Sequence, residues 1–229
     1  MNDFRTTHWD ESYSRKENYI FYPKEEVVRF FNRYIRKRTG PRSFIDLLHP
    51  GKPLKGLDFG CGIGRQVVLM EEFGVQGYGV DISSTAIDQA KELYRELLPG
   101  KTLRPDALQV LQGTKLPFAD RSFDFAISDS VLDSMYFDVA REIIKELDRV
   151  TTDLLFVSLI APVAGMSVTP EVVIHNAFER NTVQSYFDEN KIKQLLEGTG
   201  WKIAWMDLVT TVVPAVGFEN ARYHAVLQK

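Results

Sequence analysis

The sequence predicts an α/β fold built on a doubly wound, mostly parallel sheet of seven strands. Two observations support this prediction. Between residues 54 and 161, short apolar segments with strand character alternate with segments of helical periodicity. Towards the C-terminus, two strand-like segments follow each other without a helix between them. The alternation implies parallel strands joined by right-handed crossovers, and the last strand is expected to be antiparallel.

The first 45 residues are expected to form an N-terminal arm and a helix. Residues 8–23 are aromatic and polar without clear periodicity. Pro23 precedes a segment, 24–38, whose apolar residues recur at helical spacing. These are Val27, Phe31, Tyr34 and Ile35. Gly40 and Pro41 are typical of the end of a helix.

The central part of the chain contains the parallel strands and their crossover helices. Strands are expected at 54–59, 75–81, 107–113, 122–129 and 153–162. Helices are expected at 64–74, 83–100 and 138–150. Gly74 is placed to end the first of these helices, and Ser83 or Ser84 is placed to cap the second.

The strand–helix rhythm breaks after Pro162. Residues 161–187 carry no strong strand signal and are expected to form an inserted lid. A helix over 188–200 then precedes strands at 201–213 and 221–229, whose short connection requires antiparallel pairing. No linker divides the chain, so we expect one domain over 1–229 with an arm at 1–45 and a lid at 161–187.

Composition and charge restrict the class of protein. The apolar share of 44% and the charged share of 26% are those of a soluble globular domain. A net charge of −3 gives no general attraction to nucleic acid or to anionic membranes. No apolar run is long enough to span a bilayer, and the N-terminus lacks the order of a secretory signal. Cys61 is the only cysteine, which excludes an intrachain disulfide and a cysteine-based zinc site. A cytoplasmic protein is expected.

A glycine-rich loop, LDFGCGIGR at 57–65, follows the first strand of the alternating region. Its glycines, Gly60, Gly62 and Gly64, have the spacing G-x-G-x-G. The dinucleotide pattern G-x-G-x-x-G needs a third glycine at the position of Arg65 or Val67. The spacing therefore disfavours a nicotinamide or flavin dehydrogenase.

Further motifs accompany this loop. GVDIS ends the second strand at 79–83, LPFADRSFDFAI surrounds the fourth strand at 116–127, and GWKI at 200–203 leads into the last two strands. In this order the motifs resemble those of the class I S-adenosylmethionine-dependent methyltransferases, from about residue 54 to the C-terminus without the lid. The resemblance implies the Rossmann-like methyltransferase fold, S-adenosyl-L-methionine as cofactor and methyl transfer as activity.

The resemblance also implies a set of cofactor contacts. The glycines would let the amino-acid part of the cofactor lie against bare backbone. Asp58 would orient the loop or attract the ammonium group, and Asp81 would accept both ribose hydroxyls. Ile82 would cover the adenine. Gln112 stands near the position, a few residues before LPF, where the family often has an acidic residue. The expected cofactor-binding residues are Asp58, Gly60, Cys61, Gly62, Gly64, Asp81, Ile82, Gln112, Gly113, Thr114, Lys115, Ser128 and Asp129.

Three residues are candidates for the methyl-transfer step: Asp129, Asp133 and His175. Asp129 and Asp133 follow the fourth strand, and Asp133 is either an acceptor-side group or a solvated acid at a helix start. His175 in the lid is either a base near neutral pH or an ordinary surface residue. The segment SDSVLDSM lacks an N-P-P-Y-like tetrapeptide, and the fifth strand ends without an acid. We therefore expect no metal site, and metal-independent transfer to an acceptor other than exocyclic amines of DNA or glutamine side chains.

The acceptor is expected to be a small molecule, a sugar or another metabolite, methylated at oxygen or nitrogen. Tyr13, Tyr19, Phe21 and Tyr22 would either cover the cofactor or pack on the domain, and Arg15 would meet the cofactor carboxylate. Two alternatives stay open. One is an RNA or protein methyltransferase that uses a basic helix face made of Arg29, Arg33 and Arg36. The other is a non-catalytic scaffold domain; no membrane partner is expected, and the oligomeric state is not predicted.

Overall fold

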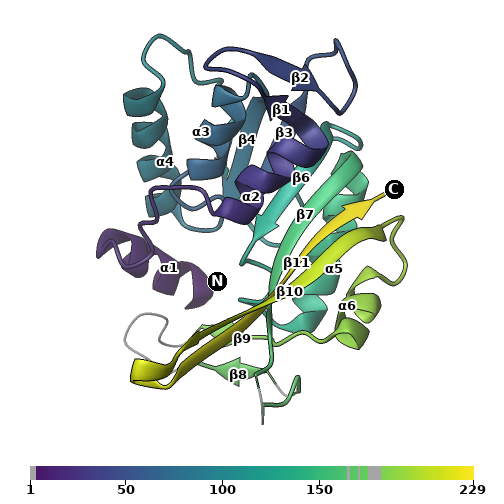
Figure 1. Ribbon diagram of the computed structural model, residues 1–229. Coiled ribbons are helices and arrows are strands. Elements are labelled where there is room, and N and C mark those ends of the chain that lie inside the picture. Colours follow the sequence, from purple (N-terminus) through teal and green to yellow (C-terminus); the bar gives the residue numbers. More distant parts are fainter. Residues whose placement is uncertain (1–3, 164–165, 170, 175–181) are drawn as a thin grey trace.

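The computed structural model describes residues 4–163, 166–169, 171–174 and 182–229. Its central feature is a seven-stranded sheet with the strand order β10-β11-β7-β6-β3-β4-β5 (Figure 1). Pairing is parallel among β3 (Lys55–Phe59), β4 (Gln76–Asp81), β5 (Leu108–Val110), β6 (Phe123–Asp129) and β7 (Thr151–Ala161). The last strand, β11 (Phe218–Gln228), pairs antiparallel with both β7 and β10 (Lys202–Val213). The predicted fold class is confirmed.

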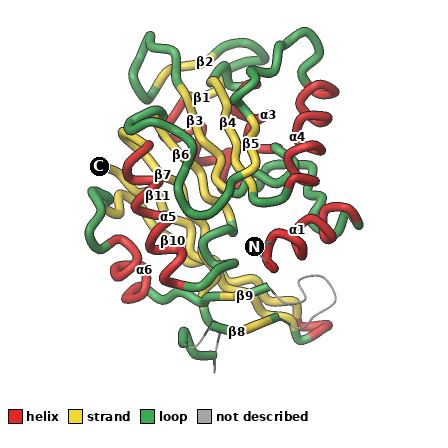
Figure 2. Tube along the Cα trace, turned by 180° about the vertical axis from the view of Figure 1, so that it is seen from behind, coloured by secondary structure: helices red, strands yellow, loops and turns green. Residues whose placement is uncertain are grey.

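Helices cover both faces of the sheet. On one face lie α2 (Glu25–Phe30), α3 (Arg65–Glu72) and α4 (Ser84–Leu97). On the other face, which is turned to the viewer in Figure 2, lie α5 (Phe137–Val150) and α6 (Glu189–Leu196). The buried residues of α5 show why it docks there, because Ala140, Ile143, Ile144 and Leu147 recur at the spacing of one helix face.

The predicted crossover elements agree closely with the structure. β6 is buried along almost its whole length, as expected for a central parallel strand with helices on both faces. Ser83 caps α4, since its side chain accepts a hydrogen bond from the amide of Ala86 at 3.0 Å. Asp188 caps α6 in the same way through the amide of Lys191 at 2.7 Å.

The N-terminal region differs from the prediction. Residues 8–23, which showed no periodicity, contain most of a helix, α1 (Phe4–Ser14). Its buried positions include Ser12 and His8 beside Tyr13, and polar residues on the buried face conceal the helical pattern.

The helix predicted over 24–38 ends early. After α2 the chain makes a π-helical turn, Phe31–Ile35, and then forms a short strand, β1 (Arg36–Arg38). β1 pairs antiparallel with β2 (Phe44–Asp46) in a separate two-stranded sheet. The side chain of Arg36 stabilises β1 in this place, because it donates hydrogen bonds to the Asp46 carboxylate in β2 and to the carbonyl of Phe73.

The segment 161–187 also contains strands that the sequence did not indicate. β8 (Val172–Val173) and β9 (Val183–Gln184) pair antiparallel, and they are too short to give a pattern. Whether this segment acts as a lid stays a prediction. The last strand, β11, begins three residues earlier than expected, so only the turn Pro214–Val216 and Gly217 separate β10 from β11.

In the described part of the chain, none of the helices combines the length and the apolar character that crossing a bilayer requires.

Candidate functional site

A cavity of about 760 Å³ opens where the parallel strands β3, β4 and β6 end. This volume lies within the range of roughly 300–1,000 Å³ that is usual for small-molecule sites. The carboxyl end of a doubly wound sheet is also the place where such folds bind ligands. The cavity wall includes residues of α1, the glycine loop, the ends of β4 and β6, and β11.

The glycine loop forms one wall of the cavity with bare backbone. Gly60 and Gly62 have φ values of +72° and +52°, a region that glycine adopts without strain. A Cβ on Gly60 would lie 2.5 Å from Cγ2 of Val131, and one on Gly62 would lie 2.6 Å from the hydroxyl oxygen of Tyr13. Both positions therefore require glycine, for backbone conformation and for space.

Asp81 stands beside this loop at the end of β4. Its Oδ2 accepts a hydrogen bond from the Gly62 amide at 2.9 Å, and its Oδ1 accepts one from the Ser83 amide at 2.9 Å. A carboxylate has about four lone-pair positions, so both oxygens keep capacity for ligand hydroxyls. Burial raises the pKa of Asp81 to about 6, against the opposing effect of the two amide hydrogen bonds.

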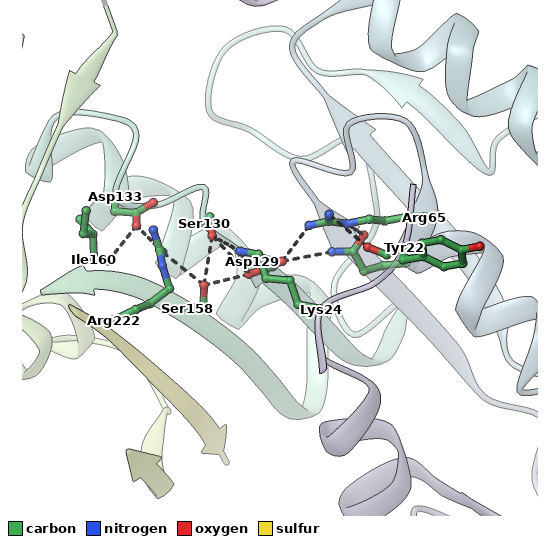
Figure 3. Close-up of polar contacts among 10 residues, drawn as sticks. Tyr22, Lys24, Arg65, Asp129, Ser130, Asp133, Ser158, Ile160 and Arg222 are labelled. Atoms are coloured by element: carbon green, nitrogen blue, oxygen red, sulfur yellow. Dashed lines mark hydrogen bonds and ion pairs between the residues drawn. The ribbon is translucent and has the colours of Figure 1, made fainter. Parts of the chain in front are cut away.

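Asp129, at the end of β6, binds two cations (Figure 3). Its Oδ1 lies 3.0 Å from Nζ of Lys24, and its Oδ2 lies 3.1 Å from Nη2 of Arg65. Ser158 donates a further hydrogen bond to Oδ1 at 2.8 Å. Burial acts to raise the pKa of Asp129, but Lys24, Ser158 and Arg65 hold it below the ordinary value. Asp129 is therefore an ionised, fully engaged group.

Ser130 carries the chain away from Asp129 in a strained conformation. Its φ is +62°, which is uncommon for a residue other than glycine, and such strain is concentrated at functional sites. The hydroxyl of Ser130 accepts a hydrogen bond from Nζ of Lys24 at 2.7 Å and lies 3.2 Å from the hydroxyl of Ser158. Ser130 is one of the residues that line the cavity wall.

Asp133 and Arg222 form a second ion pair in the cavity wall. Nη1 of Arg222 donates to Oδ2 of Asp133 at 2.7 Å, and the amide of Ile160 donates to the same oxygen at 2.8 Å. Asp133 is 2% exposed, and its Oδ1 is buried without a hydrogen-bond partner in the described chain. Arg222 also donates to the Ser158 hydroxyl at 3.3 Å, which links this pair to Asp129 (Figure 3).

The N-terminal helix α1 contributes residues to the cavity wall. Trp9 and Tyr13 line the wall, and the carbonyl of Tyr13 accepts a hydrogen bond from the side chain of Gln89 at 3.1 Å. Asp10 fastens α1 to the start of α4, because its Oδ1 accepts from the Ser83 hydroxyl at 2.6 Å and from the Thr85 amide at 3.0 Å.

The structure brings most of the predicted site residues to this cavity. Its wall includes Gly60, Cys61, Gly62, Asp81, Ile82, Gln112, Gly113, Thr114, Asp129 and Asp133. The wall does not include Asp58, Gly64, Lys115 or Ser128. His175 lies outside the described residues.

Two of the predicted residues outside the wall, Asp58 and Gly64, are buried. Asp58 is buried on β3, its Oδ2 has no partner in the described chain, and burial raises its pKa well above the ordinary range. Gly64 precedes α3 with φ +81°, and a Cβ there would lie 3.0 Å from Cβ of Ala90. Gly64 therefore allows α3 and α4 to pack closely.

The N-terminal aromatic residues divide into two groups. Tyr13 is buried in the wall, whereas Tyr19, Phe21 and Tyr22 are exposed. Arg15 is not among the cavity-wall residues and pairs with Glu11 and Glu17 on the surface, so its suggested contact with a cofactor carboxylate stays a prediction without support.

Lys24, Arg65 and Arg222 are the charged wall residues that sequence reasoning missed. Arg65 was visible directly after the glycine loop. Lys24 and Arg222 lie in α2's N-terminal flank and in the last strand, and no local motif marks them. Their roles depend on contacts with Asp129 and Asp133 that are far away in the sequence.

A separate group of potential metal ligands lies at the opposite ends of the strands. His49, Asp124 and Asp153 place one ligand atom each within 4.8 Å of one another in the part of the chain that the structure describes. Asp124 and Asp153 stand near the first residues of β6 and β7, and none of the three lines the cavity. They form no part of the site described above.

The features of the cavity fit the cofactor that the sequence motifs suggest. The bare loop at Gly60 and Gly62 leaves room for a ligand against backbone, and Asp81 keeps lone pairs for a pair of hydroxyls. Lys24 and Arg65 together exceed the charge of Asp129 by one, which suits an additional carboxylate.

Comparisons with known proteins agree with this geometry. A family model described as a methyltransferase domain matches residues 57–153. A ribosomal RNA small subunit methyltransferase C from Alcanivorax borkumensis is 38% identical over 78 residues, which are 31% of this chain and 24% of that protein. The chain therefore spans about a quarter of this curated relative.

Solved structures are similar over a larger part of the chain. A SAM-dependent methyltransferase from Methanosarcina mazei has 24% identity and a TM-score of 0.61, covering 77% of this chain and 92% of that one. Magnesium protoporphyrin IX methyltransferase from Synechocystis, crystallised with bound SAM, has 17% identity and a TM-score of 0.59, covering 100% and 85%. At these identities the similarity concerns the fold.

Proposed function

Because the chain belongs to the class I S-adenosylmethionine-dependent methyltransferases, we propose that it transfers a methyl group from S-adenosylmethionine to an oxygen or nitrogen of a small-molecule acceptor. The observation that carries this proposal is the single cavity shared by the bare glycine loop and the carboxylate of Asp81. S-adenosylmethionine needs both features, one for its methionine part and one for its ribose hydroxyls.

The cofactor side of the cavity is assigned as follows. Asp81 accepts the ribose hydroxyls, Ile82 and the segment 112–114 contact the adenine, and Gly60–Gly62 contact the methionine part. Lys24 and Arg65 bind the cofactor carboxylate, and Asp129 holds these two cations in place. Asp129 is therefore a positioning residue for the cofactor, because its low pKa and its full set of partners make it a poor base.

The acceptor side contains Asp133, whose buried Oδ1 has no hydrogen-bond partner among the described residues and is the atom we assign as the base. S-adenosylmethionine supplies a sulfonium methyl group, whose carbon–sulfur bond breaks as the acceptor atom bonds to carbon and the electron pair stays on sulfur. Oδ1 of Asp133 receives the proton that the acceptor oxygen or nitrogen loses. A positioned base of this kind contributes about 10²–10⁴-fold to the rate. His175 stays a second candidate for the same role.

The enclosure of the cavity supports a small acceptor. α1 lies over the cavity, and Trp9 and Tyr13 form part of its wall. The alternative of an RNA acceptor on the basic helix has less support, since Arg29 pairs with Glu25 and Arg36 pairs with Asp46. Magnesium protoporphyrin IX methyltransferase, one of the similar structures, is named for a small-molecule substrate.

Two measurements test this function. Calorimetry should show that the protein binds S-adenosylmethionine, and that Asp81→Ala weakens this binding by about 1.5–3 kcal/mol, the usual worth of hydrogen bonds to a charged group. Incubation with methyl-labelled cofactor and a metabolite extract should label a small molecule that resists nuclease and protease. Label in RNA or protein alone would contradict the small-molecule assignment.

The proposed reaction is independent of a metal ion. The acidic groups nearest to the acceptor side, Asp129 and Asp133, are each paired with arginine or lysine, which opposes binding of a cation. Chelation with EDTA should leave the methylation rate unchanged. Loss of activity that magnesium restores would overturn this assignment.

A further inference from the structure

The acceptor side of the cavity has a pair of groups that can identify the kind of acceptor. We propose, resting on the function given above, that Asp133 and Arg222 together recognise a neutral acceptor that carries an O–H or N–H group next to a lone-pair oxygen. Lactams, hydroxyketones and vicinal diols share this chemistry. The pair would not recognise acceptors that present a carboxylate or a phosphate to it.

The first support is the unpaired oxygen of Asp133. Both hydrogen bonds to its carboxylate, from Arg222 and from the Ile160 amide, use Oδ2. Oδ1 is turned away from these two donors and has no partner in the described chain (Figure 3). An unpaired buried carboxylate oxygen costs free energy, and a ligand O–H or N–H would supply the missing hydrogen bond.

The second support is the free edge of Arg222. Only Nη1 of its guanidinium has hydrogen bonds within the described residues, to Asp133 and Ser158. Its side chain is 20% exposed and lines the cavity, so Nε and Nη2 are available to a ligand. These nitrogens can only donate, so they select an oxygen that accepts.

The sheet holds the two groups side by side. Arg222 of β11 is the cross-strand partner of Ile160 of β7, and the Ile160 amide binds Asp133. The backbone of two paired strands therefore fixes both the cation and the acid. This arrangement gives a rigid site that presents one acceptor atom beside one donor edge.

The charge of the pair argues for a neutral acceptor. The other charged side chains among the wall residues are Asp81 and the group in which Lys24 and Arg65 each bind Asp129. The charges of Arg222 and Asp133 cancel each other. A ligand carboxylate or phosphate at this pair would lie against Oδ1 of Asp133 with no unpaired cation to balance it. A neutral group with one donor and one acceptor leaves no such imbalance.

The test combines the charge of the labelled product with a change at Arg222. The protein is incubated with methyl-labelled S-adenosylmethionine and a metabolite extract from the organism that carries the gene. The unreacted cofactor, a cation at neutral pH, is removed on a cation exchanger, any labelled product bound there is identified by mass, and the remaining products are separated on an anion exchanger. Wild type, Arg222→Lys and Arg222→Gln are compared, with Arg95→Gln on the exposed surface of α4 as a matched control. Calorimetry with S-adenosylmethionine is run on each variant.

We expect the labelled product in the unbound, neutral fraction. Arg222→Gln should lower kcat/KM for the purified acceptor by about 10- to 100-fold, the range for lost hydrogen bonds to a charged group. Most of this loss should be a higher KM, Arg222→Lys should restore part of it, and the cofactor Kd should stay unchanged. Arg95→Gln should behave as wild type.

The outcomes separate this inference from the proposed function. Label in the anion-bound fraction, or an Arg222→Gln enzyme as active as wild type, would overturn the inference and leave methyl transfer intact. No label in any fraction would contradict the proposed function, and the inference would fail with it. The charge of the wild-type product decides the matter even if Arg222→Gln does not fold.

Discussion

The two sides of the cavity are built in different ways. On the proposed cofactor side, Gly60 and Gly62 follow β3 and Asp81 ends β4. These two strands are adjacent in the sheet, and the Asp81 carboxylate binds the Gly62 amide. The proposed acceptor side uses side chains from distant parts of the chain, Asp133 after β6 and Arg222 in β11. If the proposed assignment holds, much of the cofactor's contact comes from local motifs, whereas acceptor choice depends on tertiary contacts.

Two buried acids on the proposed cofactor side differ in electrostatics. Asp81 is buried beside backbone amides, and burial raises its pKa to about 6. Asp129 is equally buried, but lysine and arginine beside it hold its pKa below the ordinary value. Cations next to a buried acid therefore lower its pKa, whereas burial without them raises it.

The largest effect should come from adding one methyl group to the loop on the cofactor side. Gly60→Ala would place a Cβ 2.5 Å from Val131 in a backbone region that costs other residues about 1–2 kcal/mol. Overpacking adds about 1–3 kcal/mol. We expect the unfolding free energy to fall by about 2–5 kcal/mol and cofactor binding to be lost, as measured by urea unfolding and calorimetry.

Gly100→Ala provides the matched control for this change. Gly100 has φ +88°, and a Cβ there would have no atom within 4 Å. It therefore carries the same conformational cost without the collision, far from the cavity wall. Equal effects of the two substitutions would show that space at the loop is unimportant.

The second prediction concerns the acceptor side. Asp133→Asn removes the base but keeps a side chain of the same shape, so kcat should fall by about 10²-fold. The Kd for the cofactor should not change, because Asp133 contacts none of the groups assigned to the cofactor. Steady-state kinetics and calorimetry measure the two quantities. A weaker cofactor Kd would show that the two sides are not separate, and exposed Asp88→Asn serves as the control.

The sequence was sufficient to predict the sheet, and most of the residues it predicted for cofactor binding line the cavity, for a common physical reason. Parallel strands and their crossover helices carry strong local patterns, as in β6 and α5. The glycine loop and Asp81 are likewise local, because each is a strand end with its own turn. Short-range patterns therefore contained most of the information about these parts.

The remaining features depend on contacts that no local pattern encodes. α1 buries Ser12 and His8, so its sequence lacks an apolar stripe. Arg222 looks like an ordinary strand residue until β11 is paired with β7 and Asp133 is placed beside it. Lys24 was interpreted only as part of a helix, whereas its role depends on Asp129.

The third prediction uses the raised pKa of Asp81. The carboxylate, which accepts ribose hydroxyls, forms as the pH rises through about 6. Cofactor affinity should therefore increase about 10-fold from pH 5 to pH 7, and Asp81→Asn should bind more weakly with no such dependence. Calorimetry at several pH values measures both. A wild-type Kd that is constant over this range would contradict the assigned role of the carboxylate.

The same shift predicts a change in the stability of the cofactor-free protein. Because the pKa of Asp81 is raised on folding, its contribution to stability is fully present below about pH 4 and is lost as the pH rises through about 6. The difference in unfolding free energy between Asp81→Asn and wild type should therefore shift in favour of the variant over this range.

The smallest effect should come from the attachment of α1, which joins the two sides of the cavity. Asp10→Ala removes the acceptor for the Ser83 hydroxyl and the Thr85 amide, so the unfolding free energy should fall by about 1 kcal/mol. Asp10→Asn should retain most of it, because asparagine also caps helices well. Since α1 carries Trp9 and Tyr13 into the wall, cofactor dissociation should become about five-fold faster in Asp10→Ala, the rate equivalent of about 1 kcal/mol. Stopped-flow measurements test this; an unchanged rate with lowered stability would show that α1 only packs on the domain and does not retain the cofactor.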